Sequence, residues 1–159
     1  VAEVITENKG VGLRSRVGHS YIKSLMAESG AIFGGEHSGH FYFADFWRAD
    51  SGMLAALYAL AELMDSNKPL SNLLKPYNRY FSSGEINSKV KDVAKSMKAV
   101  EEKYQGKYQL DHLDGLTVTA DSWWFNLRPS NTEPLLRLNV EANTEKEMAI
   151  ITDAVLALL

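Results

Sequence analysis

The chain has 159 residues, 45% of them apolar and 23% charged, a composition typical of a globular protein and not of a disordered, collagen-like or coiled-coil chain. Its formal net charge is −3 and neither half is basic, so we expect neither nucleic acid nor an anionic membrane as a partner. The sequence contains no cysteine, which excludes disulfides, thiol nucleophiles and thiolate metal ligands and fits a reducing, cytoplasmic location.

Membrane insertion and secretion are not expected from the sequence. No apolar run approaches the ~20 residues that a membrane-spanning helix needs. The first residues also lack the basic and then apolar pattern of a signal peptide. The chain begins at Val1 without a methionine, and we expect it to be a processed or excised fragment.

The first half of the chain predicts alternating helices and strands, which favours α/β packing. The expected elements are a short helix closed by Gly10, a strand over 11–17, a helix over 20–28, a buried strand over 31–33, a strand over 41–43, and a long helix to about residue 65 capped by Asp50 or Ser51. Pro69 and Pro76 lie in a polar stretch, 66–78, that reads as a linker. We place a domain boundary there, between residues 74 and 75.

The second half predicts an α+β domain. Its expected elements are a strand over 80–86, a helix over 90–100, strands over 116–119, 123–127 and 135–141, and a final helix that opens at residue 144. Thr144 and Glu147 form a capping box at the start of that helix. Apolar and polar residues alternate along the last two strands, which means that one face of the sheet is buried and the other is exposed to solvent.

The segment from Arg128 to Pro134 joins these two strands and is dense in groups that bind anions. Arg128 offers a planar fork of N–H donors that matches phosphate oxygens. Ser130 and Thr132 offer hydroxyl donors and Asn131 an amide. On composition alone an ordinary hairpin loop explains the segment equally well, because serine, asparagine and proline are common in turns.

The glycine-rich segment 34–40 lies between two apolar runs and presents polar side chains from a short loop. Glu36 beside Ser38 suits neighbouring sugar hydroxyls, and His40 can transfer a proton near neutral pH. The segment matches neither a phosphate P-loop nor a dinucleotide fingerprint. His37 and His40 have a spacing that zinc accepts, but no third ligand is evident, and a solvated glycine turn stays the simpler alternative.

His19 follows Gly18 at the start of a predicted helix, where an imidazole can meet an anion at the positive helix end. Taken alone, a histidine in this position is more often structural.

Three of these segments together resemble the carboxy-terminal part of the α-D-phosphohexomutases, and most closely the bacterial phosphomannomutase/phosphoglucomutase branch. The segment 17–23 resembles the helix entry of that family's third domain. The segment 35–40 is similar to its sugar-specificity loop, Gly-Glu-x-Ser-Gly-His. The segment 128–134 is similar to the phosphate-binding loop of its fourth domain. The resemblance spans essentially the whole chain.

This resemblance implies a fold and a division of the chain. Residues 1–74 would be the end of an α/β third domain, a mixed sheet with helices. Residues 75–159 would be the fourth domain, an antiparallel sheet with two helices on one face, like the TATA-box-binding protein. The family's phosphoserine loop and its magnesium loop do not occur here. The missing N-terminal domains, a magnesium ion in the full-length enzyme and no metal site in this chain are therefore implied.

The resemblance also implies an activity and its residues. The full-length enzyme would interconvert hexose 1-phosphate and hexose 6-phosphate through a phosphoserine and a hexose 1,6-bisphosphate, while this fragment alone would be inactive. Glu36 and Ser38 would bind the sugar, and His40 and His19 would be catalytic, with no decision between the two. The phosphate would be bound by Arg128, Ser130, Asn131 and Thr132.

The assignment to one branch of this family depends on single residues. Asn131 and His37 fit the phosphomannomutase/phosphoglucomutase type better than phosphoglucosamine mutases, which usually carry glycine and glutamine there. A phosphoglucosamine mutase fragment, a non-catalytic module that binds phosphosugars, and an α+β domain whose glycines and prolines only make turns are the alternatives.

Overall fold

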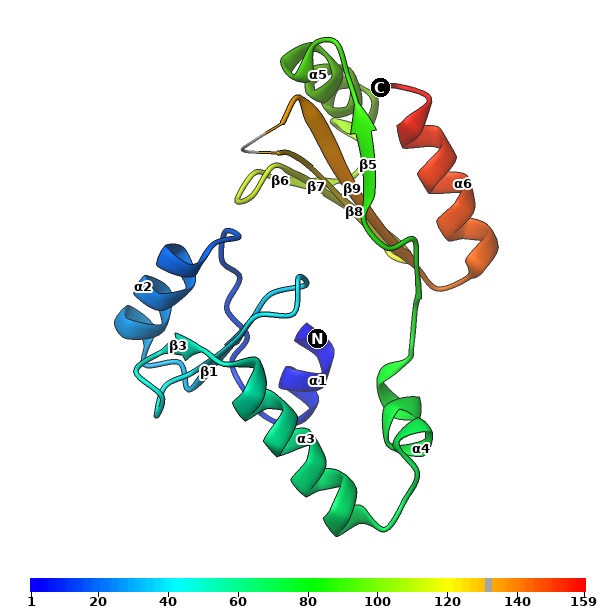
Figure 1. The fold of residues 1–159 in the computed structure, drawn as a ribbon. Coiled ribbons are helices and arrows are strands. Elements are labelled where there is room, and N and C mark those ends of the chain that lie inside the picture. Colours follow the sequence, from blue (N-terminus) through cyan, green and yellow to red (C-terminus); the bar gives the residue numbers. More distant parts are fainter. Residues whose placement is uncertain (131–132) are drawn as a thin grey trace. The chain divides into compact units, whose positions relative to one another are not determined.

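The computed structural model describes residues 1–130 and 133–159. These residues form two compact units, Val1–Asn78 (unit 1) and Arg79–Leu159 (unit 2), which are described separately (Figure 1). Over the described residues, none of the helices combines the length and apolarity needed to cross a bilayer.

Unit 1 holds a small antiparallel sheet and several helices. The strands lie in the order β1-β2-β3, with Tyr42 opposite Gly34 on one side and opposite Asp50 on the other. The elements are α1 (Ala2–Glu7), α2 (His19–Ser29), β1 (Phe33–Gly35), β2 (Phe41–Phe43), β3 (Ala49–Asp50), α3 (Gly52–Ser66), α4 (Leu70–Leu74) and the 3-10 helix η1 (Lys75–Tyr77).

Helix α2 packs on this sheet through Ile22 and Met26, which are buried together with Tyr42. Gly34 makes the close approach possible. A Cβ atom on Gly34 would lie 3.0 Å from the Ile22 side chain and 3.2 Å from the Met26 sulfur. The helix ends at Gly30, whose left-handed conformation (φ 71°) is one that glycine adopts without strain. The buried contact thus holds the first turn of α2 close to β2.

Helix α3 confirms the predicted long helix and its cap, since the Ser51 hydroxyl accepts a hydrogen bond from the Leu54 N–H at 3.1 Å. Most of its apolar side chains are exposed, however. Leu54 and Leu63 are only partly buried, and none of its residues is buried in the described structure. Met53 and Met64 are 78% and 77% exposed. The periodicity predicted the helix correctly but not the burial of its apolar face.

Three predictions for this half were wrong. Residues 11–16 have no regular secondary structure, and Val11 is 86% exposed. The strand expected at 31–33 begins instead at Phe33, and Ile32 is 82% exposed. The stretch 66–78, in which no helix was expected, contains α4 and η1, and Pro69 occupies the N-cap position of α4 without a side-chain capping hydrogen bond.

Unit 2 is built on one antiparallel sheet. Its strands follow the order β4-β9-β8-β7-β6, and β5 also pairs with β9. The single strand expected at 80–86 is two short strands, separated by Gly84 (φ 66°). The elements are β4 (Phe81–Ser82), β5 (Ile86–Lys89), α5 (Val93–Tyr104), β6 (Gln109–Asp111), β7 (Leu116–Thr119), β8 (Trp123–Pro129), β9 (Leu135–Ala142) and α6 (Glu145–Leu156).

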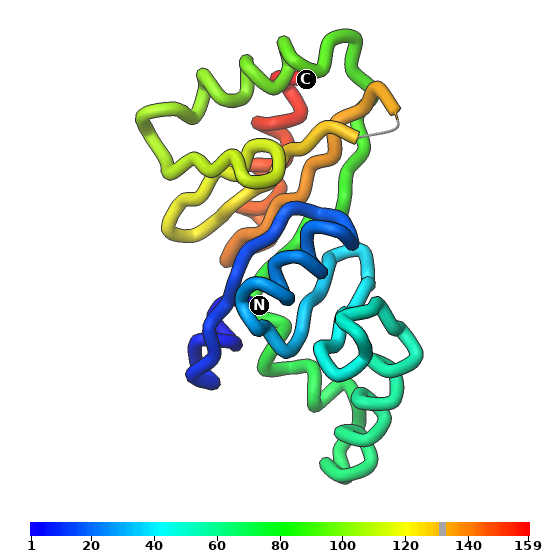
Figure 2. Tube along the Cα trace, turned by 90° about the vertical axis from the view of Figure 1, so that its left-hand side faces the viewer, coloured from blue at the N-terminus to red at the C-terminus, as the bar shows by residue number. Residues whose placement is uncertain are grey.

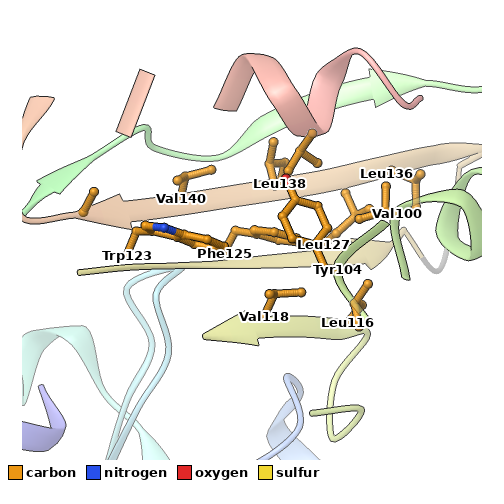
Figure 3. Packing of buried hydrophobic residues seen from close by; sticks show 12 residues of the cluster. Val100, Tyr104, Leu116, Val118, Trp123, Phe125, Leu127, Leu136, Leu138 and Val140 are labelled. Atoms are coloured by element: carbon orange, nitrogen blue, oxygen red, sulfur yellow. The ribbon is translucent and has the colours of Figure 1, made fainter. Parts of the chain in front are cut away.

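One face of this sheet carries the core. The register places Leu127 opposite both Leu116 and Leu138, and Phe125 opposite both Val118 and Val140, so that these side chains share a face. Val100 and Tyr104 of α5 and Val155 of α6 are buried in the same cluster (Figure 3). Both helices therefore cover one face, which confirms the predicted fold class.

The chain order of unit 2 is β4, β5, α5, the four strands β6 to β9, and α6. The Cα trace can be followed in this order from green to red in Figure 2. The Asp92 side chain caps α5 through the Lys95 N–H at 2.9 Å. Thr144 caps α6 through the Glu147 N–H at 3.2 Å. The Glu147 carboxylate accepts from the Ser122 hydroxyl at 2.6 Å and thereby ties α6 to the β7–β8 connection.

Candidate functional site

In unit 1 a tight hairpin turn presents the glycine-rich segment. The Glu36 N–H donates to the His40 carbonyl at 2.9 Å and the Gly39 N–H donates to the Glu36 carbonyl at 3.0 Å. Gly39 has a φ of 85°, a left-handed conformation that favours glycine. Glu36 and His40 therefore stand at the two ends of the turn, and Ser38 is exposed between them.

Tyr42, on β2, lies under this turn and joins two of the predicted site residues. Its side chain is fully buried. The hydroxyl lies 2.5 Å from Glu36 Oε1 and 3.0 Å from His19 Nδ1. Burial, and then the adjacent Glu36 carboxylate, raise the pKa of Tyr42 far above the ordinary value, so the hydroxyl keeps its proton.

His40 has a carboxylate partner from β3. Its Nδ1 lies 2.7 Å from Asp50 Oδ2, while Asp50 Oδ1 accepts the Phe41 N–H at 2.8 Å. The hydrogen bond to Asp50 raises the pKa of His40, although partial desolvation opposes this. The same hydrogen bond, followed by the Phe41 N–H, lowers the pKa of Asp50. An imidazole held by a carboxylate is suited to exchange a proton through its other ring nitrogen.

The two histidines lie against each other, because the His19 and His40 ring centroids are 4.9 Å apart and the rings are inclined by 64°. His19 is the first residue of α2, after Gly18 (φ 128°). The structure therefore brings together His19, Glu36 and His40, which the sequence analysis selected from two separate segments. Tyr42 and Asp50 complete this group of five, named here the histidine cluster.

Unit 2 places Arg128 near the end of β8, next to Arg137 of β9 in the strand register. Both guanidinium groups meet one carboxylate: Arg128 Nη2 lies 3.4 Å from Glu85 Oε2, and Arg137 Nη1 lies 3.5 Å from Glu85 Oε1. The Arg128 side chain is 19% exposed. A partly buried pair of arginines at the base of a hairpin is a suitable place for an anion to bind.

The loop beyond Arg128 is closed by backbone hydrogen bonds, since the Ser130 N–H donates to the Leu135 carbonyl at 2.9 Å. Asn131 and Thr132, which the sequence analysis also assigned to phosphate, lie outside the described residues.

The zinc alternative gains no support from the described residues, which contain no group of three histidine, cysteine, aspartate or glutamate side chains able to hold a metal ion. His40 Nδ1 already has the Asp50 carboxylate as its partner, and His37 is exposed on the turn.

Three residues of these sites were missed by the sequence analysis. Tyr42 was read only as part of an apolar run, and Asp50 only as a possible helix cap. Glu85 lay in a segment expected to be a strand. No local motif marks them. The register of β2 and β3 is what brings Asp50 beside Tyr42, and Glu85 lies in the short connection between β4 and β5.

Comparison with known proteins gives the same assignment over both units. Residues 1–80 match the family model described as phosphoglucomutase/phosphomannomutase, alpha/beta/alpha domain III. Residues 85–158 match the model for the C-terminal domain of the same family.

Individual relatives agree. A phosphomannomutase of Methanocaldococcus jannaschii is 47% identical over 93% of this chain and 33% of its own length. A phosphomannomutase of Escherichia coli is 39% identical over 99% of this chain and 35% of its own length. The chain thus spans about a third of the length of the curated relatives it matches.

A solved structure extends the similarity to three dimensions. The phosphoglucomutase/phosphomannomutase family protein of Burkholderia thailandensis matches with a TM-score of 0.83 and 30% sequence identity, over 99% of this chain and 34% of that one. Family models, relatives and fold therefore agree along almost the entire sequence. The chain belongs to the phosphoglucomutase/phosphomannomutase family and corresponds to its domain III and C-terminal domain.

Proposed function

We propose that the chain is the substrate-binding C-terminal part of a phosphomannomutase/phosphoglucomutase, an enzyme that interconverts hexose 1-phosphate and hexose 6-phosphate through a phosphoserine and a bisphosphorylated sugar. The observation that carries the proposal is the histidine cluster, in which Glu36, His19 and His40 are held together beside an exposed turn. The relatives' name, phosphomannomutase, and the family description, phosphoglucomutase/phosphomannomutase, support mannose and glucose phosphates as substrates in preference to glucosamine phosphate.

The reaction has to bind one sugar in two orientations, since the phosphate is given to one end and returned from the other. Two kinds of contact meet this need. Glu36 and Ser38 bind equatorial hydroxyls, which look alike in both orientations. The phosphate that is not reacting is held by a second set of residues, Arg128, Ser130, Asn131 and Thr132. Each set is assigned from the chemistry of its own side chains.

His40 is the better candidate for proton transfer. Asp50 engages its Nδ1, so the free nitrogen is Nε2, and the pKa of His40 is raised. When the sugar hydroxyl attacks phosphorus, the O–P bond forms as the bond to the serine oxygen breaks, and the hydroxyl proton passes to His40 Nε2. In its protonated form, with an N–H on both ring nitrogens, His19 would balance charge on the phosphate.

Further parts of the enzyme would come from the missing N-terminal domains. We place the domain boundary between residues 74 and 75, with the third domain before it and the fourth after it. The resemblance implies a magnesium ion in the full-length enzyme, and the described residues of this chain offer no group suited to hold it.

A titration tests the phosphate part of this proposal. The chain, followed by NMR, is titrated with inorganic phosphate, glucose 1-phosphate and mannose 1-phosphate. We expect Arg128→Ala to weaken binding of all three by one to two powers of ten, since a charged hydrogen bond to phosphate contributes ~1.5–3 kcal/mol.

The control is Lys98→Ala, which removes the same charge from an exposed position of α5 and should leave binding unchanged. Equal affinities for wild type and Arg128→Ala would contradict the phosphate assignment. Binding of phosphate without preference for either sugar phosphate would favour the non-catalytic module instead.

A further inference from the structure

The buried hydroxyl of Tyr42 links Glu36 and His19, two residues of the proposed site. The role inferred for this hydroxyl rests on the proposed function. We propose that Tyr42 is a positioning residue: its single hydroxyl proton orients Glu36 toward the sugar and fixes the tautomer of His19. The argument begins from the two contacts of the hydroxyl, at 2.5 Å to Glu36 Oε1 and 3.0 Å to His19 Nδ1.

Hydrogen-bond accounting decides where the protons are. A tyrosine hydroxyl has one proton to donate, and a carboxylate can only accept. The proton of Tyr42 is therefore directed to Glu36. Toward His19 the same oxygen can only accept, so the neutral His19 ring carries its proton on Nδ1 and its lone pair on Nε2.

Asp50 imposes the same tautomer on the second histidine. Its carboxylate also only accepts, so His40 Nδ1 donates to Asp50 and the lone pair of neutral His40 lies on Nε2. Two neighbouring imidazoles, 4.9 Å apart, are thus set in one tautomer by two different residues, Tyr42 and Asp50. Because His19 is held by Tyr42 and His40 by Asp50, a substitution of one partner should change the tautomer of one histidine only, and the other histidine serves as an internal control.

Packing alone does not require the hydroxyl. Tyr42 is fully buried with Ile22 and Met26, and a phenylalanine ring would fill the same space. A buried hydroxyl has to be paired, and here both of its partners are side chains selected for sugar and phosphate chemistry. Tyr42 holds Glu36 by its Oε1 atom, so Oε2 can still accept hydrogen bonds from ligand hydroxyls. The orientation of the carboxylate is then fixed before the ligand binds.

The first test reads the tautomers directly. The chain is labelled with nitrogen-15 in histidine, and multiple-bond proton–nitrogen spectra are recorded at about pH 9, well above the ordinary histidine pKa of about 6.5. Tyr42 and His40 contact His19, and the nearby carboxylates are those of Glu36, bound to Tyr42, and Asp50, bound to His40. We expect His19 and His40 both to be protonated on Nδ1.

Two variants then separate the partners. Tyr42→Phe should abolish the Nδ1–H preference of His19 and leave that of His40 intact, whereas Asp50→Asn should affect His40 and spare His19. A wild-type His19 protonated on Nε2 would overturn the inference, and so would an unchanged His19 in Tyr42→Phe. The wild-type spectrum decides the matter even if a variant does not fold.

The second test links the tautomer to binding. Tyr42→Phe should weaken glucose 1-phosphate binding about tenfold, the effect of losing one charged hydrogen bond, and leave inorganic phosphate binding unchanged. Equal sugar phosphate affinities in wild type and variant would overturn the positioning role while the proposed function stands. A wild-type chain that shows the expected tautomers but binds no sugar phosphate would instead contradict the proposed function.

Discussion

At the scale of the residue, the His40–Asp50 pair is the feature most open to measurement. Folding raises the pKa of His40 above its ordinary 6.5 through the Asp50 hydrogen bond, so the pair stabilises the fold fully below about that pH. This contribution is lost as the pH rises through the raised pKa. The lowered pKa of Asp50 sets the other limit: its contribution is present above the ordinary 3.8 and is lost as the pH falls through the lowered value.

Removing the Asp50 charge tests this description. Asp50→Asn should lower the pKa of His40, because the hydrogen bond to a carboxylate is the largest cause of the shift. The measurement is an NMR pH titration of the His40 ring protons in both proteins. His112 is a suitable reference, since its Glu101 partner lies in unit 2 and the substitution should not affect it. A His40 titration curve that does not move in Asp50→Asn would be incompatible with the pair.

The candidate site could be predicted in part at this scale. Glu36, His40 and His19 were chosen from their residue types and neighbours, because glycine spacing and helix starts are local signals. Tyr42 and Asp50 were not, since a carboxylate eight residues beyond a tyrosine acquires meaning only through the pairing of β2 with β3. A prediction from sequence therefore finds the groups that chemistry needs more readily than those that hold them.

At the scale of the element, the β7–β8–β9 sheet supports the Arg128 loop. Gly115 precedes β7 with a φ of 71°, and a Cβ atom there would lie 2.5 Å from the Leu127 carbonyl oxygen and 2.8 Å from Arg128 Cα. A real Cβ atom does not come this close to backbone atoms, so a side chain at residue 115 would force the backbone to shift. The glycine therefore allows β7 and the end of β8 to lie in contact immediately before the loop.

Gly115→Ala should destabilise unit 2 by about 2–4 kcal/mol, because the left-handed conformation and the backbone clash both oppose it. Urea unfolding of unit 2, followed by its amide resonances, measures the effect. Gly106→Ala is the matched control: Gly106 also has a positive φ (75°), but nothing lies within 4 Å of its Cβ position, and about 1 kcal/mol is expected. An equal loss of unfolding free energy in Gly115→Ala and Gly106→Ala would show that the backbone clash at residue 115 does not affect stability.

Elements with a complete local pattern were predicted well. Residues of β8 and β9 alternate between buried and partly exposed, and this alternation is visible in the sequence. The expected strand over 11–17 was wrong because β-branched residues favour a strand only where a partner strand completes the ladder, and the described structure pairs none with it. Helix α4 was missed because the flanking prolines dominated the interpretation of a short leucine-containing segment.

At the scale of the whole molecule, the two units differ in how much they bury. The buried core of unit 2 draws on three strands, β7, β8 and β9, and on both helices, and it includes Phe125 and Leu138 at 0% exposure. The buried cluster of unit 1 is limited to Ile22, Met26 and Tyr42, while α3 leaves its apolar residues exposed. Since apolar burial is the main stabilising term, the units should differ in stability.

Residues 79–159 alone are therefore expected to fold and to unfold cooperatively in urea, with the midpoint that unit 2 shows within the whole chain. Unit 1 should unfold at a lower urea concentration. Amide resonances assigned to each unit provide the measurement. A residue 79–159 fragment without dispersed resonances would contradict the independence of unit 2, and a shared midpoint in the whole chain would contradict the difference between the units.

Glu85 has a consequence for how an anion would enter the Arg128 loop. Because this carboxylate already meets Arg128 and Arg137, an incoming anion does not fill an empty place but exchanges with a bound partner. The binding free energy of the incoming anion is then the difference between its own interaction with the two arginines and the interaction of Glu85 with them. Such an exchange discriminates by valence: a doubly charged anion gains more from two guanidinium groups than the single charge it displaces, whereas chloride or acetate gains nothing. If Arg128 binds phosphate as proposed, the Glu85 pairing of Arg128 and Arg137 would therefore favour dianions over single charges.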